Sequence, residues 1–206
     1  MNFKNLANKA VNFIADRLKE LIGLSLSVIS ILIGISLASY SPEDPNFIYS
    51  ENTKIENILG FQGSFASDLL FQSLGLISIL LCLTIFFTGI NIIRLKKILL
   101  ILENFFFSIL YIISGSFFFS IFYPESFWLT FNGNGGFVGN TIQNTFLFSL
   151  TNINQTISYY FLILLTLFFF LMSINFNLKG FFNFISKILK LLKKDKEKLY
   201  KQEDIQ

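Results

Sequence analysis

The sequence predicts an all-α integral membrane protein with four transmembrane helices, both termini cytoplasmic, and short interfacial or re-entrant helices in the outer loops. The composition excludes a soluble domain: 53% of the residues are hydrophobic, only 14% are charged, and the mean hydropathy is +0.62. Four apolar stretches approach or exceed the roughly 20 residues that a helix needs to cross a bilayer. They are residues 21–40, 69–93, 105–123 and 156–176, and none has a charged residue in its interior.

The first apolar stretch is predicted to be a retained helix rather than a cleaved export signal. Its apolar region, residues 21–40, is longer than the central region of a signal peptide. A turn motif follows it directly, where a signal peptide would have a small-residue cleavage site. We therefore count it as the first of the four spans.

The charges of the connecting segments predict the orientation, because Lys and Arg near helix ends stay on the cytoplasmic side. Basic residues gather before the first span, between the second and third spans, and after Asn177, where eight lysines follow. The first outer loop, residues 41–68, instead has five acids against Lys54, and the second, residues 124–155, has Glu125 alone. The inner residues that decide the assignment are Lys4, Lys9, Arg17, Lys19, Arg94, Lys96 and Lys97.

Both outer loops are long, and long loops either carry function or contain further structure. Residues 137–150 form an apolar stretch too short for a span, with helical spacing of its apolar residues, which favours an interfacial or re-entrant helix. A shift of residues 60–74 by 76 positions gives five identities with the second loop, including Gly60 on Gly136 and Gly63 on Gly139. Two readings stay open: two parallel helical hairpins, or chance matching in a chain rich in Phe, Ser and Leu.

The chain divides into three predicted parts. Residues 1–20 form a cytoplasmic amphipathic segment with Phe3, Leu6 and Leu18 on one face, and residues 21–177 form the membrane domain. Residues 178–206 form a basic amphipathic tail suited to anionic lipid headgroups, followed by the start of a polar linker. Nucleic-acid contact by this tail is the weaker alternative.

Catalysis is not predicted for this polypeptide, and neither is a cofactor or metal site. The chain has no His, and its one cysteine, Cys82, lies inside the second span and is interpreted as a packing residue. A Gly-x-x-x-x-Gly-Lys-Ser/Thr loop does not occur, so no nucleotide phosphate can be held in that way. The polar residues of the spans suit hydrogen bonds between helices, namely Gln72, Ser78, Thr84, Thr88, Ser114 and Ser116.

Two sequence blocks and a glycine cluster stand out in the outer loops. Pro42 and Pro45 end the first helix, and the Ser and acidic residues around them favour a turn. The glycines permit positive φ angles or close helix approach, and Asp68 is predicted to lie at the N-terminal end of the second helix, beside its dipole. The candidate residues are Ser39, Tyr40, Ser41, Pro42, Glu43, Asp44, Pro45, Asn57, Gly60, Gly63, Asp68, Gly75, Gly135, Gly136 and Gly139.

These residues resemble the amino-terminal four-helix membrane domain of the FtsK/SpoIIIE DNA translocases. Residues 39–45 are similar to the Ser-Tyr-Ser-Pro-x-Asp-Pro sequence that follows the first helix of that family, and residues 57–75 are similar to its glycine-containing second block. Gly135, Gly136 and Gly139 match a Gly-Gly-x-x-Gly element of its second outer loop. The chain departs from the family at three positions, Ser64, Ser67 and Leu74, where the family has Ala, Ala and Phe.

The resemblance, which covers roughly residues 21–176, implies a positional function. A domain of this kind would anchor a cytoplasmic ATP-driven DNA motor, absent from this chain, at the division septum of the bacterial inner membrane and stabilise the divisome there. It implies the lipid bilayer, copies of the same chain, divisome membrane proteins and the motor domain as partners, without direct nucleic-acid contact. A small four-helix channel or transporter unrelated to division is the alternative, although such proteins usually show charges or interrupted helices within the membrane.

Overall fold

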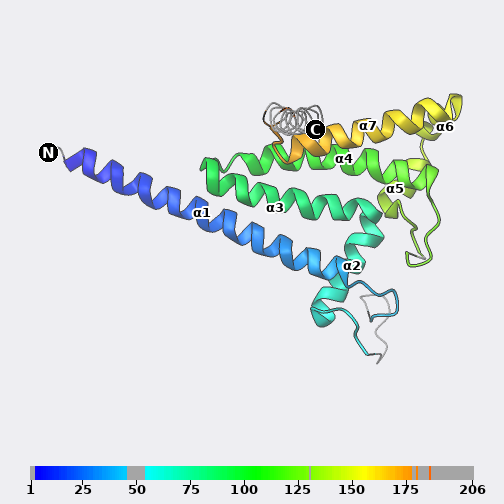
Figure 1. The fold of residues 1–206 in the computed structure, drawn as a ribbon, viewed down its shortest axis with the longest axis horizontal. Helices are drawn as coiled ribbons and strands as arrows, with labels where there is room; N and C mark the ends of the chain where they lie inside the picture. The colour runs from blue at the N-terminus through cyan, green and yellow to red at the C-terminus, as the bar shows by residue number, and fades with distance from the viewer. Residues whose placement is uncertain (1–2, 46–53, 130, 178–179, 181–185, 187–206) are drawn as a thin grey trace, which may run out of the picture. The chain divides into compact units, whose positions relative to one another are not determined.

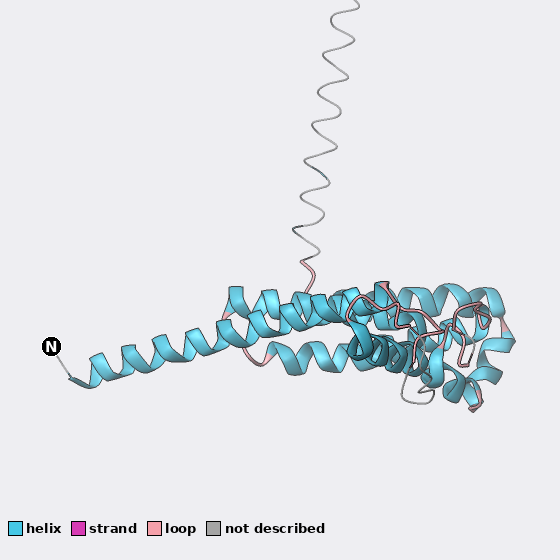
Figure 2. Cartoon of the chain, turned by 90° about the horizontal axis from the view of Figure 1, so that it is seen from below, coloured by secondary structure: helices cyan, strands magenta, loops and turns pink. Residues whose placement is uncertain are grey.

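The computed structural model describes residues 3–45, 54–129, 131–177, 180 and 186, and these form helices and loops without a strand (Figure 2). Residues up to Asn175 make up one compact unit, and a second unit begins at Phe176. The predicted basic tail, residues 178–206, lies almost wholly outside the described residues. The helices are α1 Phe3–Ala38, α2 Gly60–Leu74, the 3₁₀ turn η1 Gly75–Ile77, α3 Ser78–Leu95, α4 Leu100–Phe122, α5 Gly136–Gln143, α6 Phe146–Ile153 and α7 Gln155–Ser173.

The prediction of four transmembrane helices is confirmed. Four helical stretches are long and apolar enough to cross a membrane: Asn8–Ala38, Gly60–Leu95, Leu100–Phe122 and Gln155–Ser173. The second stretch contains a sharp bend, because the η1 turn at Gly75 separates α2 from α3 (Figure 1). The cytoplasmic position of the termini stays a prediction.

Within the first unit the spanning helices pack as two antiparallel pairs, α1 with α3 and α4 with α7, joined where α3 contacts α4 (Figure 1). The short helices α2, α5 and α6 all lie at one end of these pairs, which we call the loop end. The turn between α3 and α4 lies at the opposite end with Arg94, Lys96 and Lys97, and we call it the basic end. The alternation in the sequence between basic connections and connections poor in Lys and Arg therefore corresponds to two distinct ends of the bundle.

Small residues allow α1 and α3 to approach closely. A β-carbon built on Gly89 of α3 would lie 2.3 Å from the Ser27 hydroxyl and 2.5 Å from the Gly23 carbonyl of α1. One turn farther along, the Ser30 hydroxyl donates to the Cys82 carbonyl at 2.6 Å. Lipid is as apolar as a leucine side chain, so close backbone contact and hydrogen bonds of this kind hold membrane helices together. Cys82 is a packing residue here, in contact with α1.

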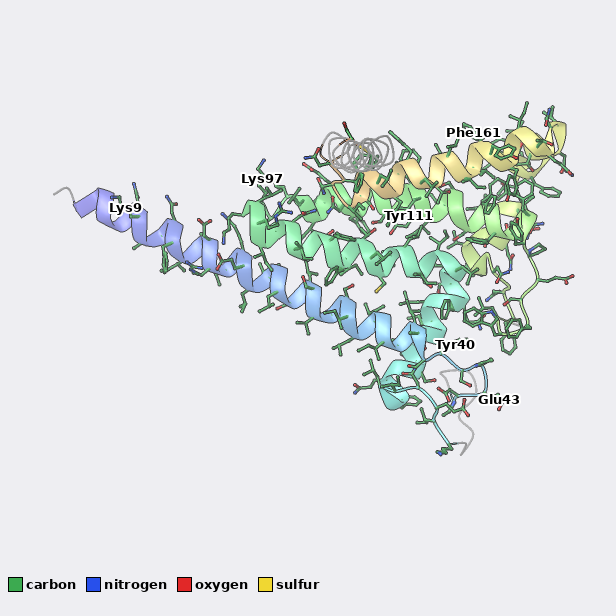
Figure 3. The ribbon with its side chains drawn as sticks, in the orientation of Figure 1. Lys9, Tyr40, Glu43, Lys97, Tyr111 and Phe161 are labelled. Atoms are coloured by element: carbon green, nitrogen blue, oxygen red, sulfur yellow. The ribbon has the colours of Figure 1, made fainter. Side chains whose placement is uncertain are left out.

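A ladder of side-chain hydrogen bonds joins α3, α4 and α7. At its centre the Thr84 hydroxyl bonds both the Tyr111 and the Ser173 hydroxyls at 3.0 Å, and Figure 3 shows Tyr111 between the helices. Nearer the basic end, the Asn104 amide donates to Thr88 at 2.7 Å and its carbonyl accepts from Asn175 at 2.5 Å. These contacts confirm the expectation that Thr84 and Thr88 bond neighbouring helices. Asn104 itself is buried.

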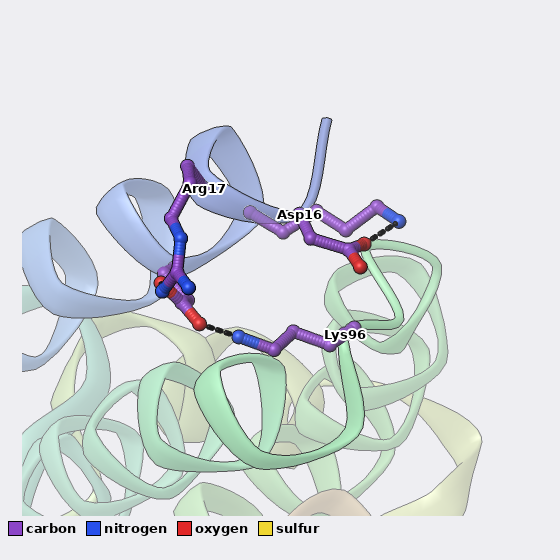
Figure 4. A network of polar contacts seen from close by, with 5 residues as sticks. Asp16, Arg17 and Lys96 are labelled. Atoms are coloured by element: carbon purple, nitrogen blue, oxygen red, sulfur yellow. Dashed lines mark hydrogen bonds and ion pairs between the residues drawn. The ribbon is translucent and has the colours of Figure 1, made fainter. Parts of the chain in front are cut away.

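At the basic end an ion pair joins α1 to the α3–α4 turn, beside two ion pairs within α1 (Figure 4). Glu20 pairs with Lys96 of that turn and also accepts from Arg17 at 2.5 Å, while Lys19 bonds Asp16 at 2.9 Å. Helix α1 runs without a break through residue 20, so the predicted boundary between an amphipathic segment and a span is not marked by a loop. Its 36 residues correspond to about 54 Å at roughly 1.5 Å per residue, well beyond a hydrocarbon core of about 30 Å.

The Gly23–Gly89 contact generates the first prediction. Replacing Gly89 by Ala forces α1 and α3 apart and should lower the free energy of unfolding by about 1–3 kcal/mol, the usual range for overpacking. The measurement is the unfolding of the detergent-solubilised protein followed by circular dichroism. Ser25→Ala is the matched control, because Ser25 is exposed on α1 and bonds only its own helix. Equal unfolding curves for the two variants would contradict the prediction.

Candidate functional site at the loop end

The two predicted sequence blocks meet at the loop end and form one hydrogen-bonded network. Helix α1 ends at Ala38, four residues before Pro42, and the Asp44 N–H donates to the Ser41 carbonyl at 3.3 Å, which closes a turn. The chain returns at residue 54 and enters α2 at Gly60. The helix stop predicted for the proline-containing block is therefore present.

Asp44 organises the returning chain. Its side chain is only 4% exposed, and its two carboxylate oxygens accept hydrogen bonds from the backbone N–H groups of Glu56 at 2.7 Å and Asn57 at 2.9 Å. Bonds from backbone amides to a carboxylate are stronger than those between neutral groups and compensate for its burial. The neighbouring Glu43 is exposed on the loop (Figure 3), so the two adjacent acids have different environments.

Asn57 joins the end of α1 to the start of α2. Its side-chain amide is buried and donates to the carbonyls of Ser36 at 2.9 Å and Ser39 at 3.2 Å. Its side-chain oxygen accepts from the Leu59 N–H at 3.1 Å. The last carbonyls of a helix have no partner within the helix, so Asn57 caps α1 from a distant part of the chain.

Gly63 is required by this arrangement, because a β-carbon at that position would lie 2.1 Å from the Asn57 side-chain oxygen. The Gly63 carbonyl accepts from the hydroxyls of Ser36 at 2.5 Å and Ser67 at 2.9 Å, and the Ser64 hydroxyl donates to the Pro45 carbonyl at 3.0 Å. Ser64 and Ser67 are two of the positions where the chain departs from the family pattern. Both departures add hydrogen bonds to the network.

The prediction that Asp68 lies beside the N-terminus of the second helix is wrong. Helix α2 begins at Gly60, so Asp68 lies in its interior, where it accepts from the Tyr40 hydroxyl at 3.3 Å and the Gln72 amide at 3.4 Å. Burial, together with the negative charge of Asp68, raises the pKa of Tyr40 to about 12. Asp68 therefore connects the first sequence block to the middle of α2.

Trp128 brings the second outer loop into the site. Its ring lies 5.4 Å from that of Phe71 and 6.2 Å from that of Tyr40, and the rings of Tyr40 and Phe71 are 5.0 Å apart, measured between centroids. The sequence reasoning missed Trp128. Its being the one Trp of the chain, close to a predicted membrane surface, was an available signal, since Trp is enriched at such interfaces.

The remaining glycines form a second junction, between the bend after α2 and the start of α5. Gly75 has φ +66° and Gly136 has φ +64°, and a β-carbon on Gly136 would lie 2.4 Å from the Gly75 nitrogen. The Leu76 N–H donates to the Asn134 carbonyl at 3.0 Å, which ties the bend to the second loop. The sequence singled out these glycines but did not indicate that they face one another.

Gly135 and Gly139 allow the second loop to lie on α4. A β-carbon on Gly139 would lie 2.3 Å from the Ser116 carbonyl, and one on Gly135 would lie 2.8 Å from the same atom. Gly60 differs, because it has φ +65° but no atom within contact distance of a β-carbon. Gly60 and Gly136 each begin a short helix with a positive φ, a feature common to the two halves, and the repeat stays a hypothesis.

The chemistry of the loop end is that of a structural network. The carboxylates of Asp44 and Asp68 accept from backbone, amide and phenol donors. In the part of the chain that the structure describes, no three His, Cys, Asp or Glu side chains gather in a way that could hold a metal ion. The site holds both outer loops to the ends of the spanning helices through hydrogen bonds and aromatic contacts.

The family comparison decides the class of this domain. The model of the 4TM region of DNA translocase FtsK/SpoIIIE matches residues 15–186. The chain belongs to this family. The loop-end network of this FtsK-family domain is therefore formed by the same residues that carry the resemblance in sequence.

Two curated relatives agree with the family match. A DNA translocase FtsK from Bradyrhizobium diazoefficiens is 39% identical over 72 residues, which cover 35% of this chain and 9% of the relative. A DNA translocase FtsK from Azospirillum brasilense is 36% identical over 73 residues, 34% of this chain and 12% of the relative. The matched part is thus a small fraction of each relative. No solved structure matches the chain.

The adjacent acids of the FtsK-family motif provide the second prediction. Asp44→Asn removes the charge and replaces one of the two accepting oxygens by an NH2 donor, so one backbone hydrogen bond is lost and the free energy of unfolding should fall by about 1–3 kcal/mol. Glu43→Gln removes the same charge one residue earlier, at an exposed position, and should leave the stability within about 0.5 kcal/mol of the parent. Chemical unfolding in detergent compares the two, and an equal loss would show that Asp44 acts only through net charge.

The third prediction concerns Tyr40, whose pKa of about 12 in the folded protein exceeds the ordinary value of roughly 10. The unfolded chain releases this proton at lower pH, so the contribution of the neutral phenol to stability is complete below pH about 10 and is lost as the pH rises towards about 12. A spectrophotometric titration should show one phenolate transition near pH 12 that is missing in Tyr40→Phe. If Tyr40→Phe instead loses a phenolate transition near pH 10, Tyr40 has an ordinary pKa and the buried environment assigned to it is wrong.

Proposed function

We propose that this chain is the membrane anchor of an FtsK-type DNA translocase and that it directs the translocase to the division septum and stabilises the divisome there. The family match over residues 15–186 carries the proposal, since it covers the first membrane-crossing helix from residue 15 and the other three completely. The chain is a multi-pass membrane domain of this family. Septal targeting and the divisome role are the proposed part.

The loop end supports a positional role. The first outer loop has five acids against one Lys, and its returning segment is fixed through Asp44 and Asn57 to the spanning helices. A loop held in this way keeps one surface towards the outside, which is useful for recognition by other division proteins. The partners proposed are further copies of this chain and divisome membrane proteins.

The motor activity belongs to other sequence in this proposal. No phosphate-binding loop of the Gly-x-x-x-x-Gly-Lys-Ser/Thr type occurs in the chain, and the relatives named DNA translocase FtsK are far longer than the matched segment. The chain itself then has neither ATP-driven activity nor direct nucleic-acid contact. Its contribution to chromosome segregation is to hold the motor where the septum closes.

The fourth prediction tests the positional role in the source bacterium. A fluorescent fusion of residues 1–206 should concentrate at the septum, and depletion of the native protein should impair division. Substitutions at the loop end test the site directly. Asp44→Asn, which disturbs the hydrogen-bonded network, should reduce septal enrichment at equal membrane abundance. Glu43→Gln, at an exposed position, should retain it. Fluorescence spread evenly around the envelope, with normal division after depletion, would overturn the proposal and favour a function unrelated to division.

A further inference from the structure

Beyond Glu125, the second outer loop and the helix after it carry no charge. Between Glu125 and Lys179 the sequence contains no Asp, Glu, Lys, Arg or His, whereas the first outer loop has six charged residues. A segment of this length that is exposed to water normally includes charged residues. The absence of charge indicates that α5 and α6, which lie within this segment, are in contact with the membrane rather than with the aqueous phase.

The surface of α6 supports this placement. Phe146 is 74% exposed, Leu150 53% and Ile153 80%, so most of one side of this eight-residue helix is bare apolar surface. The same kind of surface continues on the adjoining spanning helix α7, where Ile157 and Phe161 are exposed. Exposed apolar patches of this kind are stable only against an apolar neighbour. The lipid-facing surface of α7 therefore extends over α6.

A cavity of about 300 Å³ opens within this surface, between α4, α5, α6 and α7. Phe161 is both exposed to the outside and part of the cavity wall, and Figure 3 shows it projecting from α7. The cavity is thus continuous with the surface that contacts lipid. Among its apolar wall residues are Ile113, Phe117, Ile142, Leu147, Leu150 and Leu162.

The few hydroxyl groups of the cavity wall already donate hydrogen bonds to backbone carbonyls. Ser114 donates to the Leu110 carbonyl at 3.0 Å, Thr151 to the Phe148 carbonyl at 2.7 Å, and Ser158 to the Thr151 carbonyl at 3.2 Å. An occupant therefore finds apolar side chains and no charged group. Water is disfavoured in such a cavity because it needs several polar partners.

We propose that this cavity binds one acyl chain of a membrane phospholipid in the loop-end leaflet. A methylene group is about as large as a water molecule in the liquid, roughly 30 Å³, so the cavity accepts a segment of roughly ten methylene groups. The uncharged rim fits the hydrocarbon part of the lipid and does not select an anionic headgroup. The bound chain fills the space between the re-entrant helices α5 and α6 and the span α7, and links their packing to the surrounding bilayer.

The test uses the full chain in phosphatidylcholine liposomes that contain a phosphatidylcholine with a photoreactive diazirine in the middle of one acyl chain. After illumination, cross-linked peptides are identified by mass spectrometry. The parent protein should be labelled at α4, α6 and α7 residues of the cavity wall. Leu150→Trp places an indole at the cavity wall and should abolish this labelling.

Ile153→Trp is the matched control, because it also replaces an aliphatic residue of α6 by Trp, but at a position that does not line the cavity. It should keep the cavity labelling, while labelling of the outer surface of α7 stays constant in all three proteins. Circular dichroism confirms that each variant is folded, and Leu147→Phe gives a second, smaller filling variant. Cavity labelling that survives both filling variants, or that is no stronger than labelling of the outer surface of α7, would overturn the proposal.

Discussion

The low polarity of the bilayer is the constraint on which this structure depends. Apolar side chains gain little by leaving lipid for one another, so helices associate through close backbone contact and hydrogen bonds. The α1–α3 pair relies on Gly23 and Gly89, and the joining of α3, α4 and α7 relies on Thr84 and Asn104. Many large apolar residues remain on the lipid side, although Phe71 and Ile92 are buried. The interior of this domain is accordingly rich in small polar residues, mainly Ser and Thr, which soluble proteins mostly expose.

The same constraint explains why the FtsK-family motif is concentrated where helices end. The final carbonyls of a helix have no partner within that helix. At the end of α1, the Asn57 side-chain amide donates to the carbonyls of Ser36 and of Ser39, which follows the helix directly. Asp44 in turn fixes the backbone that carries Asn57. Because each residue is held by the next, the motif acts as a structural unit.

The parts of the fold that depend on local properties could be predicted from the sequence. Apolar length gave the four spans, and Pro42 gave the end of α1. The misplaced elements depend on contacts between distant residues. The apolar stretch begins at residue 69, so it places Asp68 at a helix terminus, whereas α2 already begins at the polar and Gly-containing residues from Gly60. Trp128 was missed because no residue near it in the sequence indicates its contact with Phe71. The burial of Asn104 likewise depends on a distant residue, because its partner Asn175 lies 71 residues farther along the chain, just after α7.

Each half of the domain connects its two spanning helices through short helical segments, but the two connections differ in polarity. Each half needs a short helix between two spans, and each begins that helix with a glycine at positive φ, Gly60 or Gly136. The first half surrounds α2 with hydrogen-bonded acids such as Asp44, which suits a loop that faces water. The second half has no charge through α5 and α6 and exposes apolar residues such as Ile153. Because lipid rather than water adjoins the apolar cavity of the second half, an acyl chain completes the packing that the side chains there leave open.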